Sequence, residues 1–341
     1  MLIRSIAPLR LGLAGGGTDL SPYSDIYGGA ILNATISMYV YVSIEPRNDK
    51  KIKIISFDKK EKILTKAIPH LEINGKLDLI KGVYNAIVKK FNKGKPLSFN
   101  MYTYSDAVPG SGLGASSTLV VAVIGAFVEW LKLPLGKYDI ARLAFEIERI
   151  DIGQSGGKQD QYAATFGGFN FMEFYDNNKV IVNPLRIKQE IIDELQHNLL
   201  LYYTGKSRFS SKIIDAQVQN IQSHKGKSIS AMHNLKKQAI LMKEALLAGK
   251  INEIGKILHF GWKYKKQTAE CISNPILDKI YETAIKAGAT GGKISGAGGG
   301  GFMMFYCPKN TKYKVIEALK KFGGEFIKYQ FTKDGLKTWR I

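Results

Sequence analysis

The alternation of apolar and polar residues predicts strands and helices in both halves of the chain. Segments rich in Ile, Val, Tyr, Phe and Thr are typical of strands, which we expect at 30–44, 52–57, 97–104, 169–174, 198–203 and 301–306. Apolar residues at helical spacing, or in one long apolar run, predict helices at 79–91, 116–128, 138–150, 229–267 and 274–287. Residues 153–168 are rich in Gly and Gln, and we expect them to be irregular.

A chain of 341 residues is longer than one average domain. The segment 175–184 is polar and contains the pair Asn177–Asn178, which is typical of a turn or a domain junction. We therefore predict two domains, with residues 1–185 in the first and residues 186–341 in the second.

The net charge of +20 is the unusual feature of the composition. Such a charge attracts nucleic acid, an anionic membrane surface or anionic small molecules. The lysine runs at 50–66 and 309–321 contain no Arg, and no RNA-binding or zinc-finger signature accompanies them. We therefore expect a solvated basic face, with no nucleic-acid or membrane partner. Two cysteines, Cys271 and Cys307, with no signal peptide or membrane span, predict reduced thiols in a cytoplasmic protein.

The most informative local pattern is a glycine-rich loop that leads directly into the apolar helix. A helix start offers free backbone N–H groups and a favourable dipole to a phosphate, and glycines let the ligand approach closely. Two more glycine-rich segments, 11–19 and 293–301, accompany this loop. The residues that we expect to bind nucleotide phosphates are Pro109, Gly110, Ser111, Gly112, Leu113, Gly114, Ala115, Ser116 and Ser117.

Other phosphate-binding motifs do not fit this sequence. A P-loop requires a Gly five residues before Gly-Lys-Ser, but Leu200 and Ile221 stand at those positions. A literal dinucleotide fingerprint occurs at 110–115, yet its acidic residue, Glu129, lies in the same helical run, so no second strand presents it to a ribose. The His-Arg-Asp and Asp-Phe-Gly motifs of protein kinases are absent from the sequence.

Taken together, segments 7–19, 109–117 and 293–301 resemble the three ordered motifs of the GHMP kinase superfamily. That superfamily includes galactokinase, homoserine kinase, mevalonate kinase and phosphomevalonate kinase. The resemblance implies an α+β fold of two domains, the first similar to ribosomal protein S5 domain 2 and the second ferredoxin-like. Residues 15–19 and 27–36 look most like the sugar-kinase branch, and within it like kinases of heptose 7-phosphate.

This resemblance implies an enzyme that uses ATP and Mg²⁺ to phosphorylate the anomeric hydroxyl of D-glycero-D-manno-heptose 7-phosphate. The product would supply nucleotide-activated heptose for surface polysaccharide. Two alternatives stay open: a kinase of L-fucose or another unphosphorylated sugar, and a basic RNA-binding protein, because S5-like domains also occur in RNA-associated proteins. The oligomeric state is also open, with a homodimer as one option.

The resemblance also assigns a metal site. Ser116 stands at the family's magnesium position, and a Glu from the helix before residue 151 would share the ion with phosphate oxygens. Glu148, in the sequence Glu-x-Glu-Arg, matches that position. Glu146 is the alternative, although ion pairs with Arg142 and Arg149 on the helix surface would explain it equally well.

Asp160 resembles the catalytic Asp of the galactokinase and mevalonate kinase branches. It would accept the proton of the attacking hydroxyl or orient that hydroxyl. The alternative is that Asp160 is an ordinary turn residue with no catalytic role. The spacing from Glu148 to Asp160 is one residue longer than in mevalonate kinases. Arg10, in Ala-Pro-x-Arg, would lie near Asp160 and steady the transferred phosphate, and Lys158 would share that task.

The remaining assignments concern the sugar. Gly16, Gly17, Thr18 and Asp19 match positions at which sugar kinases bind substrate hydroxyls. The backbone of Gly296, Gly298 and Gly299 would close over the reacting groups. Lys206 and Arg208 follow the strand at 198–203 and would bind the phosphate already on the sugar, unless they belong to a basic surface turn.

Overall fold

The computed structural model describes residues 1–107, 110–205, 210–223 and 225–341. The elements before residue 185 are β1 (Ile3–Ala14), α1 (Tyr23–Tyr27), β2 (Gly29–Pro46), β3 (Lys51–Ser56), β4 (Glu61–Lys66), α2 (Asp78–Phe91), β5 (Phe99–Ser105), α3 (Ala115–Leu131), α4 (Lys137–Phe145), the π-helix η1 (Glu146–Asp151), α5 (Gln159–Phe166), β6 (Phe169–Phe174) and β7 (Val180–Pro184).

The elements after residue 185 are α6 (Gln189–Asn198), β8 (Leu199–Tyr203), α7 (Ser210–Gln222), α8 (Gly226–Leu247), η2 (Ile251–Glu253), α9 (Ile254–Lys265), η3 (Glu270–Ile272), α10 (Pro275–Lys286), β9 (Gly291–Ile294), β10 (Phe302–Tyr306), α11 (Lys312–Leu319), η4 (Lys320–Phe322), β11 (Glu325–Phe326) and β12 (Lys337–Arg340).

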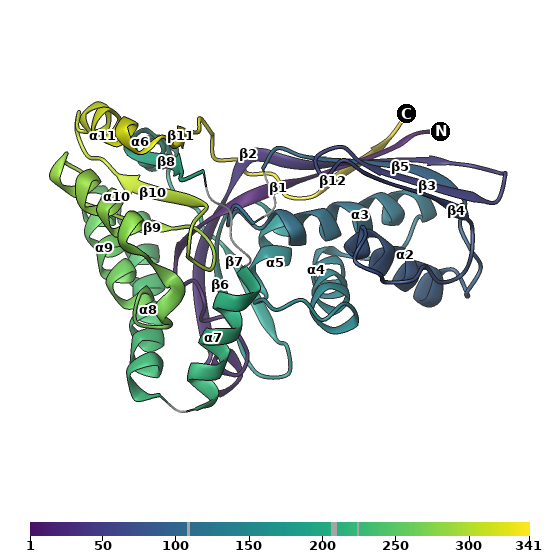
Figure 1. Cartoon of the computed structure of the whole chain (residues 1–341), viewed down its shortest axis with the longest axis horizontal. Coiled ribbons are helices and arrows are strands. Elements are labelled where there is room, and N and C mark those ends of the chain that lie inside the picture. The colour runs from purple at the N-terminus through teal and green to yellow at the C-terminus, as the bar shows by residue number, and fades with distance from the viewer. Residues whose placement is uncertain (108–109, 206–209, 224) are drawn as a thin grey trace.

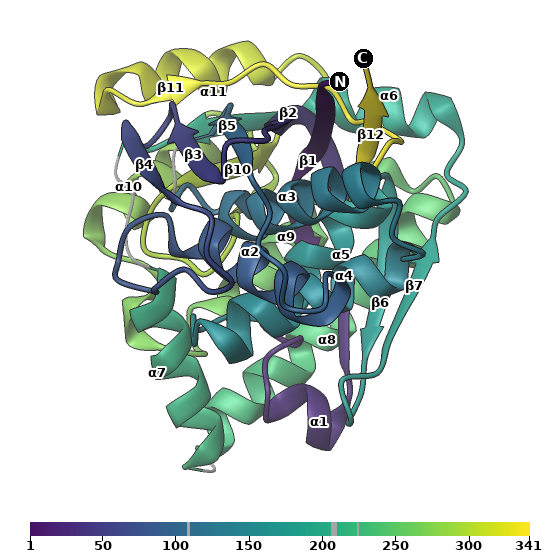
Figure 2. The same ribbon diagram turned by 90° about the vertical axis from the view of Figure 1, so that its right-hand side faces the viewer.

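The central strand of the larger sheet is β2, which is long enough to pair with different strands along its two halves. Its order is β12-β1-β2-β5-β3-β4, and β6 pairs with β2 and with β7. Residues 29–34 of β2 pair with β6, whereas residues 40–46 pair with β5. Helices α2, α3, α4 and α5 lie on one face of this sheet (Figure 1). Figure 2 shows the β6–β7 hairpin extending along the side of the molecule toward α1.

Helix α3 is the centre of the first core. Its side chains from Ser117 to Phe127 are all buried, because the sheet covers one side and helices α2, α4 and α5 cover the others. An apolar residue on every face is what a fully enclosed helix requires. The helix begins after Gly114, whose φ of +80° is a left-handed conformation that favours glycine. The start of α3 is therefore fixed at the glycine-rich loop.

The smaller sheet has the order β11-β8-β10-β9, and all of its pairs are antiparallel. Helix α9 packs against β9 and β10, and α8 packs against α9 and against β1 and β2. The chain then returns to the larger sheet, where β12 pairs with β1 and places the two termini side by side (Figure 1). The boundary at 185/186 falls between β7 and α6 and stays a prediction; β12 lies beyond it in sequence but in the larger sheet.

The α+β fold predicted from the sequence is confirmed. Elements that the sequence did not predict include β4, α6, α7, α11 and β12, and some of the predicted segments differ locally. The helix expected at 229–267 is two helices, because the chain turns at Gly249 with a φ of +69° between α8 and α9. The helix expected at 138–150 continues from α4 into the π-helix η1. The segment expected to be irregular, 153–168, contains α5, which begins one residue before Asp160.

Within the described residues, none of the helices combines the length and the apolar character that crossing a membrane requires.

Candidate active site

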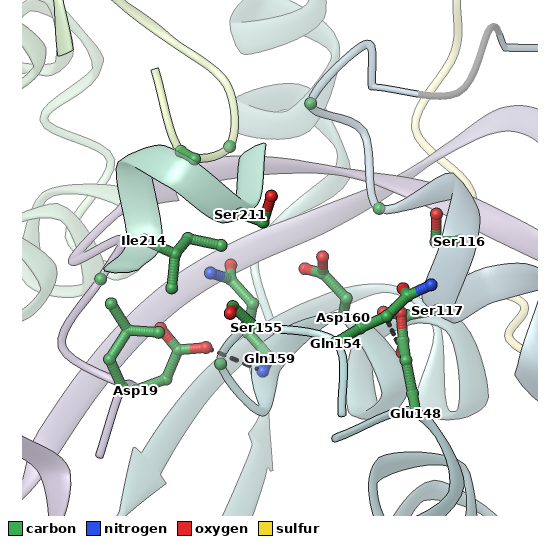
Figure 3. A pocket seen from close by; sticks show the side chains of 18 of the residues that line it. Asp19, Ser116, Ser117, Glu148, Gln154, Ser155, Gln159, Asp160, Ser211 and Ile214 are labelled. Carbon is green, nitrogen blue, oxygen red and sulfur yellow. Dashed lines mark hydrogen bonds between the residues drawn. The ribbon is translucent and has the colours of Figure 1, made fainter. Parts of the chain in front are cut away.

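A cavity of about 610 Å³ opens where the two sheets meet, and all three glycine-rich segments reach it. Its walls come from both halves of the chain (Figure 3). The lining residues belong to β1 and the turn after it, the start of α3, η1, the loop 153–157, the start of α5, α7, the end of α9 and the loop 296–297.

Arg10 and Asp160 form an ion pair at the bottom of this cavity. Asp160 Oδ1 accepts hydrogen bonds from Arg10 Nε and lies 2.7 Å from both Nε and Nη2. The Nη1 group of the same guanidinium donates to the Gly112 carbonyl at 2.6 Å. Arg10 is 4% exposed, so its charge is held between these partners rather than by water. The predicted proximity of Arg10 and Asp160 is confirmed.

The second and third glycine-rich segments pack backbone against backbone. A Cβ at Gly112 would lie 2.2 Å from the Ser295 carbonyl oxygen, and a Cβ at Gly296 would lie 2.8 Å from Gly112 Cα. Ser295 Oγ also donates to the Gly112 carbonyl at 3.0 Å. Any side chain would therefore push the two loops apart. Gly296 lines the cavity, whereas the predicted residues Gly298 and Gly299 contact the backbone of Ile272 instead.

Glu148 is a buried carboxylate that faces the start of α3. It is 1% exposed, and its Oε2 accepts hydrogen bonds of 2.6 Å from Ser117 Oγ and from Gln161 Nε2. Burial raises the pKa of Glu148, an effect that the adjacent Arg149 guanidinium partly opposes. The π-helix η1 presents this side chain, and such widened turns are frequent at functional sites.

The sequence predicts Ser116 and Glu148 as the metal-binding pair, with Glu146 as the alternative glutamate. The hydroxyl in contact with Glu148 belongs to Ser117, while Ser116 is exposed at the cavity mouth. Glu146 points away, pairing with Lys90 at 2.9 Å and with Arg142 at 3.9 Å. The surface ion pair expected between Glu146 and Arg142 is present, whereas Arg149 pairs with Glu148 at 3.3 Å rather than with Glu146. Glu148 is the glutamate that lines the cavity.

These donors suit Mg²⁺ only in combination with a ligand. Among the residues that the structure describes, no group of three His, Cys, Asp or Glu side chains could hold a metal ion. Mg²⁺ is usually bound by one or two carboxylates together with phosphate oxygens and water. A buried carboxylate with a raised pKa, beside the Ser117 hydroxyl and the start of α3, fits that mode of binding.

Arg149 is a site residue that the sequence reasoning missed. Its guanidinium donates to the carbonyls of Gln154, Ser155 and Gly157, which shapes the loop 153–157. A Cβ at Gly156 would lie 2.2 Å from Arg149 Cζ, so the loop must carry glycine there. Its place directly after Glu148 in the sequence is the signal that could have identified it.

Asp19 lies on the other side of Asp160 from Ser116, Ser117 and Glu148 in the view of Figure 3. Its Oδ2 accepts the backbone N–H of Gln159 at 3.0 Å, and burial raises its pKa. Gly17 and Asp19 line the cavity as predicted. The Thr18 hydroxyl instead donates to the carbonyls of Gly15 and Ala30 and accepts the Ala30 N–H. The Gly16 carbonyl accepts a hydrogen bond from Lys265 Nζ at 3.1 Å.

Lys158 does not take the place that the sequence predicted for it. Its Nζ lies 3.6 Å from Asp25 Oδ1 and 5.8 Å from the Phe145 ring centroid. It is absent from the described residues that line the cavity. The reason is its position as the residue before α5, which directs it away from Asp160. The predicted residues Pro109, Lys206 and Arg208 lie outside the described part of the chain.

Lys293 donates to the Gly12 carbonyl in the first glycine-rich segment, and its pKa predicts how the stability of the protein depends on pH. Burial, with the nearby Lys265 and Arg10 charges, lowers the pKa of Lys293 to about 7. The folded protein therefore binds fewer protons than the unfolded chain from about pH 7 to about pH 10.4, and the free energy of unfolding should rise across that window. Urea unfolding of Lys293→Met should show a smaller rise between pH 7.0 and pH 8.5 than the wild type.

The matched control is Lys286→Met, because Lys286 is exposed at the end of α10 and should keep the wild-type pH dependence. An unchanged pH dependence in Lys293→Met would contradict the account of this buried ammonium group.

Comparison with known proteins identifies the family. The GHMP kinases N terminal domain matches residues 78–168, and the GHMP kinases C terminal domain matches residues 242–325. The D-glycero-alpha-D-manno-heptose 7-phosphate kinase of Campylobacter jejuni is 52% identical, with 99% of both chains covered. A solved structure of a D-glycero-D-manno-heptose 1-phosphate kinase from Bacteroides thetaiotaomicron is 47% identical, covers 99% of both chains and has a TM-score of 0.85.

A more distant relative is the bifunctional fucokinase/GDP-fucose pyrophosphorylase of Arabidopsis thaliana, 28% identical over 94% of this chain and 31% of its own. The match to the N terminal domain contains the second glycine-rich segment, and the match to the C terminal domain contains the third. The two heptose phosphate kinases match over nearly their whole length. The chain belongs to the GHMP kinase family.

Proposed function

We propose that this protein transfers the γ-phosphoryl group of ATP to the anomeric hydroxyl of D-glycero-D-manno-heptose 7-phosphate, which yields the 1,7-bisphosphate. The identity to the Campylobacter jejuni heptose 7-phosphate kinase over 99% of both chains supports the choice of sugar. The Bacteroides thetaiotaomicron protein is named a heptose 1-phosphate kinase, which supports a heptose phosphate as the substrate class. The weaker match to a fucokinase makes L-fucose the second candidate.

The observation that best supports phosphoryl transfer is the position of the Asp160 carboxylate. Arg10 holds this carboxylate beside the start of α3. A Cβ at Gly114, the residue before α3, would lie 3.2 Å from Asp160 Oδ2. A phosphate bound at that helix start would therefore lie close to a carboxylate that can accept a hydrogen bond from a hydroxyl. This arrangement suits phosphoryl transfer, which depends on positioning and charge rather than on covalent help from the protein.

The nucleotide would lie along the start of α3. A second, small cavity shares Ala115 and Ser116 with the main one. It is otherwise lined by Val40, Leu79, Tyr104 and Leu119 together with the polar residues Asp58, Lys59 and Ser105. We assign the base of ATP to that side and the phosphates to the glycine-rich loop. Mg²⁺, held by Glu148 with a serine hydroxyl and the phosphate oxygens, would neutralise charge on the transferred group.

The sugar would lie on the side of Asp19. The buried Asp19 carboxylate accepts one backbone N–H and keeps lone pairs for sugar hydroxyls. In the reaction, the anomeric oxygen forms a bond to the γ-phosphorus as the bond to the bridging oxygen of ADP breaks. Asp160 accepts the hydrogen bond of that hydroxyl, and Arg10 holds Asp160 in place while adding positive charge beside the transferred group. We place the reaction in the cytoplasm.

The choice of substrate is tested by steady-state kinetics with a panel of sugars. D-glycero-D-manno-heptose 7-phosphate, the unphosphorylated heptose, L-fucose and galactose would each be supplied with Mg²⁺ and ATP, and ADP release would be measured. The heptose 7-phosphate should have the highest kcat/KM by at least tenfold. Equal or better turnover of L-fucose would replace the proposed substrate with the second candidate.

Asp160→Asn should reduce kcat by roughly 10²- to 10⁴-fold, because the amide keeps the shape but no longer accepts the proton or pairs with Arg10. ATP binding, measured by calorimetry, should be nearly unchanged. Asp151→Asn is the control, since Asp151 is exposed at the end of η1. Wild-type kcat in Asp160→Asn would remove Asp160 from the reaction.

Glu148→Gln should raise the Mg²⁺ concentration needed for half-maximal rate, because the buried carboxylate is the proposed metal ligand. Glu146→Gln is the matched control on the same turn and should behave as the wild type, since Glu146 pairs with surface cations. A metal defect in Glu146→Gln but not in Glu148→Gln would reverse the assignment.

A further inference from the structure

Lys265 is a buried cation in the cavity wall that the reaction described above does not use. It is the last residue of α9, is 5% exposed and lines the cavity from the C-terminal half of the chain. Its Nζ donates to the Gly16 carbonyl at 3.1 Å, which is its one hydrogen bond to the described residues. An ammonium group has three N–H donors, so two remain for a ligand.

The other cations that line the described part of the cavity are already engaged. Arg10 holds Asp160 and the Gly112 carbonyl. Arg149 donates to three carbonyls of the loop 153–157 and contacts Ser117 and Glu148. Of the cations that line the described part of the cavity, Lys265 is therefore the one with N–H donors available to a ligand. It lies on the side of Asp19 rather than on the side of Ser117 and Glu148.

Gly17 opens the path from the cavity to this ammonium group. Its φ is +107°, and a Cβ there would lie only 3.0 Å from Lys265 Nζ. Any other residue would cover the cation, whereas glycine leaves it accessible to a ligand in the cavity. Gln217 lines the same part of the cavity: it is 1% exposed, and its Nε2 donates to Thr268 Oγ1 at 2.6 Å.

We propose that Lys265, exposed to the cavity through Gly17, binds the phosphate already carried by the sugar substrate and thereby selects phosphorylated sugars. This rests on the proposed function, in which Asp160 faces the hydroxyl at one end of the sugar. The sugar phosphate then spans from Asp160 past Asp19 to Lys265. A doubly negative group is a suitable partner for a buried cation that has no carboxylate within ion-pairing distance in the described structure.

The electrostatics of the group agree with this geometry. Burial lowers the pKa of Lys265 to about 8, and the Asp19 charge opposes that change only in part. Lys293 lies behind the same segment, donating to the Gly12 carbonyl at 2.6 Å, and adds a second buried nitrogen near Gly16. A dianion in the cavity would favour the charged form of both groups.

The test is the ratio of kcat/KM for heptose 7-phosphate to kcat/KM for the unphosphorylated heptose. In Lys265→Met this ratio should fall roughly tenfold or more, because a charge-assisted contact to the phosphate is lost. The KM for ATP should stay within about twofold of the wild type. Lys265→Arg should recover part of the ratio, since it restores the positive charge.

Lys263→Met is the matched control on the same helix, because Lys263 is exposed and outside the cavity. If both sugars lose the same factor in Lys265→Met, Lys265 acts by holding the Gly16 carbonyl, and the proposal is wrong. A change in the KM for ATP alone would place Lys265 on the nucleotide side and would also overturn it.

The experiment distinguishes a wrong role for Lys265 from a wrong substrate for the enzyme. If the wild-type protein does not phosphorylate heptose 7-phosphate, the proposed function fails. If it does so but Lys265→Met keeps the wild-type ratio, only the role of Lys265 fails. Circular dichroism and a thermal transition like that of Lys263→Met establish that Lys265→Met is folded.

Discussion

The ion pair of Arg10 and Asp160 is the interaction on which the site depends. It joins β1 to the first turn of α5, and the same guanidinium binds the Gly112 carbonyl of the second glycine-rich segment. Ser295 bonds to that carbonyl as well, so the third segment is attached at the same point. Removing one member would leave a largely buried charge unpaired, which costs about 3–5 kcal/mol. The geometry of three distant segments thus rests on one cluster of polar contacts.

Around this pair, a buried carboxylate and a buried ammonium group lie on different sides of the cavity. Glu148 faces the start of α3, and burial raises its pKa, so a cation there would favour the ionised form. Lys265 stands on the side of Asp19, and burial lowers its pKa, so an anion there would favour the ammonium form. Each group is therefore matched to the charge that the proposed substrates carry: a metal-bound nucleotide on one side and a sugar phosphate on the other.

The fold class and the meeting of Arg10 with Asp160 were predicted from the resemblance of three glycine-rich segments to the GHMP kinase motifs, and the structure confirms both. The phosphate site at the start of α3 was predicted from the glycines and hydroxyl residues there, and it stays a prediction. The resemblance named Ser116 as the metal-binding serine, whereas the hydroxyl in contact with Glu148 belongs to Ser117. Consecutive helical residues point in directions about 100° apart, and tertiary packing sets which of them faces Glu148. Lys158 was misplaced because the start of α5 was not foreseen. Lys265 was missed because its neighbours Gly17 and Asp19 lie far away in the chain.

The central claim is that Asp160 faces the anomeric hydroxyl of a sugar that already carries a phosphate. Phosphorus NMR of the product tests it most directly, using the wild-type protein with Mg²⁺, ATP and D-glycero-D-manno-heptose 7-phosphate. The account predicts a second sugar phosphate signal whose phosphorus couples to the anomeric proton, formed in equal amount to ADP. A new phosphate coupled to any other sugar proton, or ADP formed with inorganic phosphate alone, would contradict it.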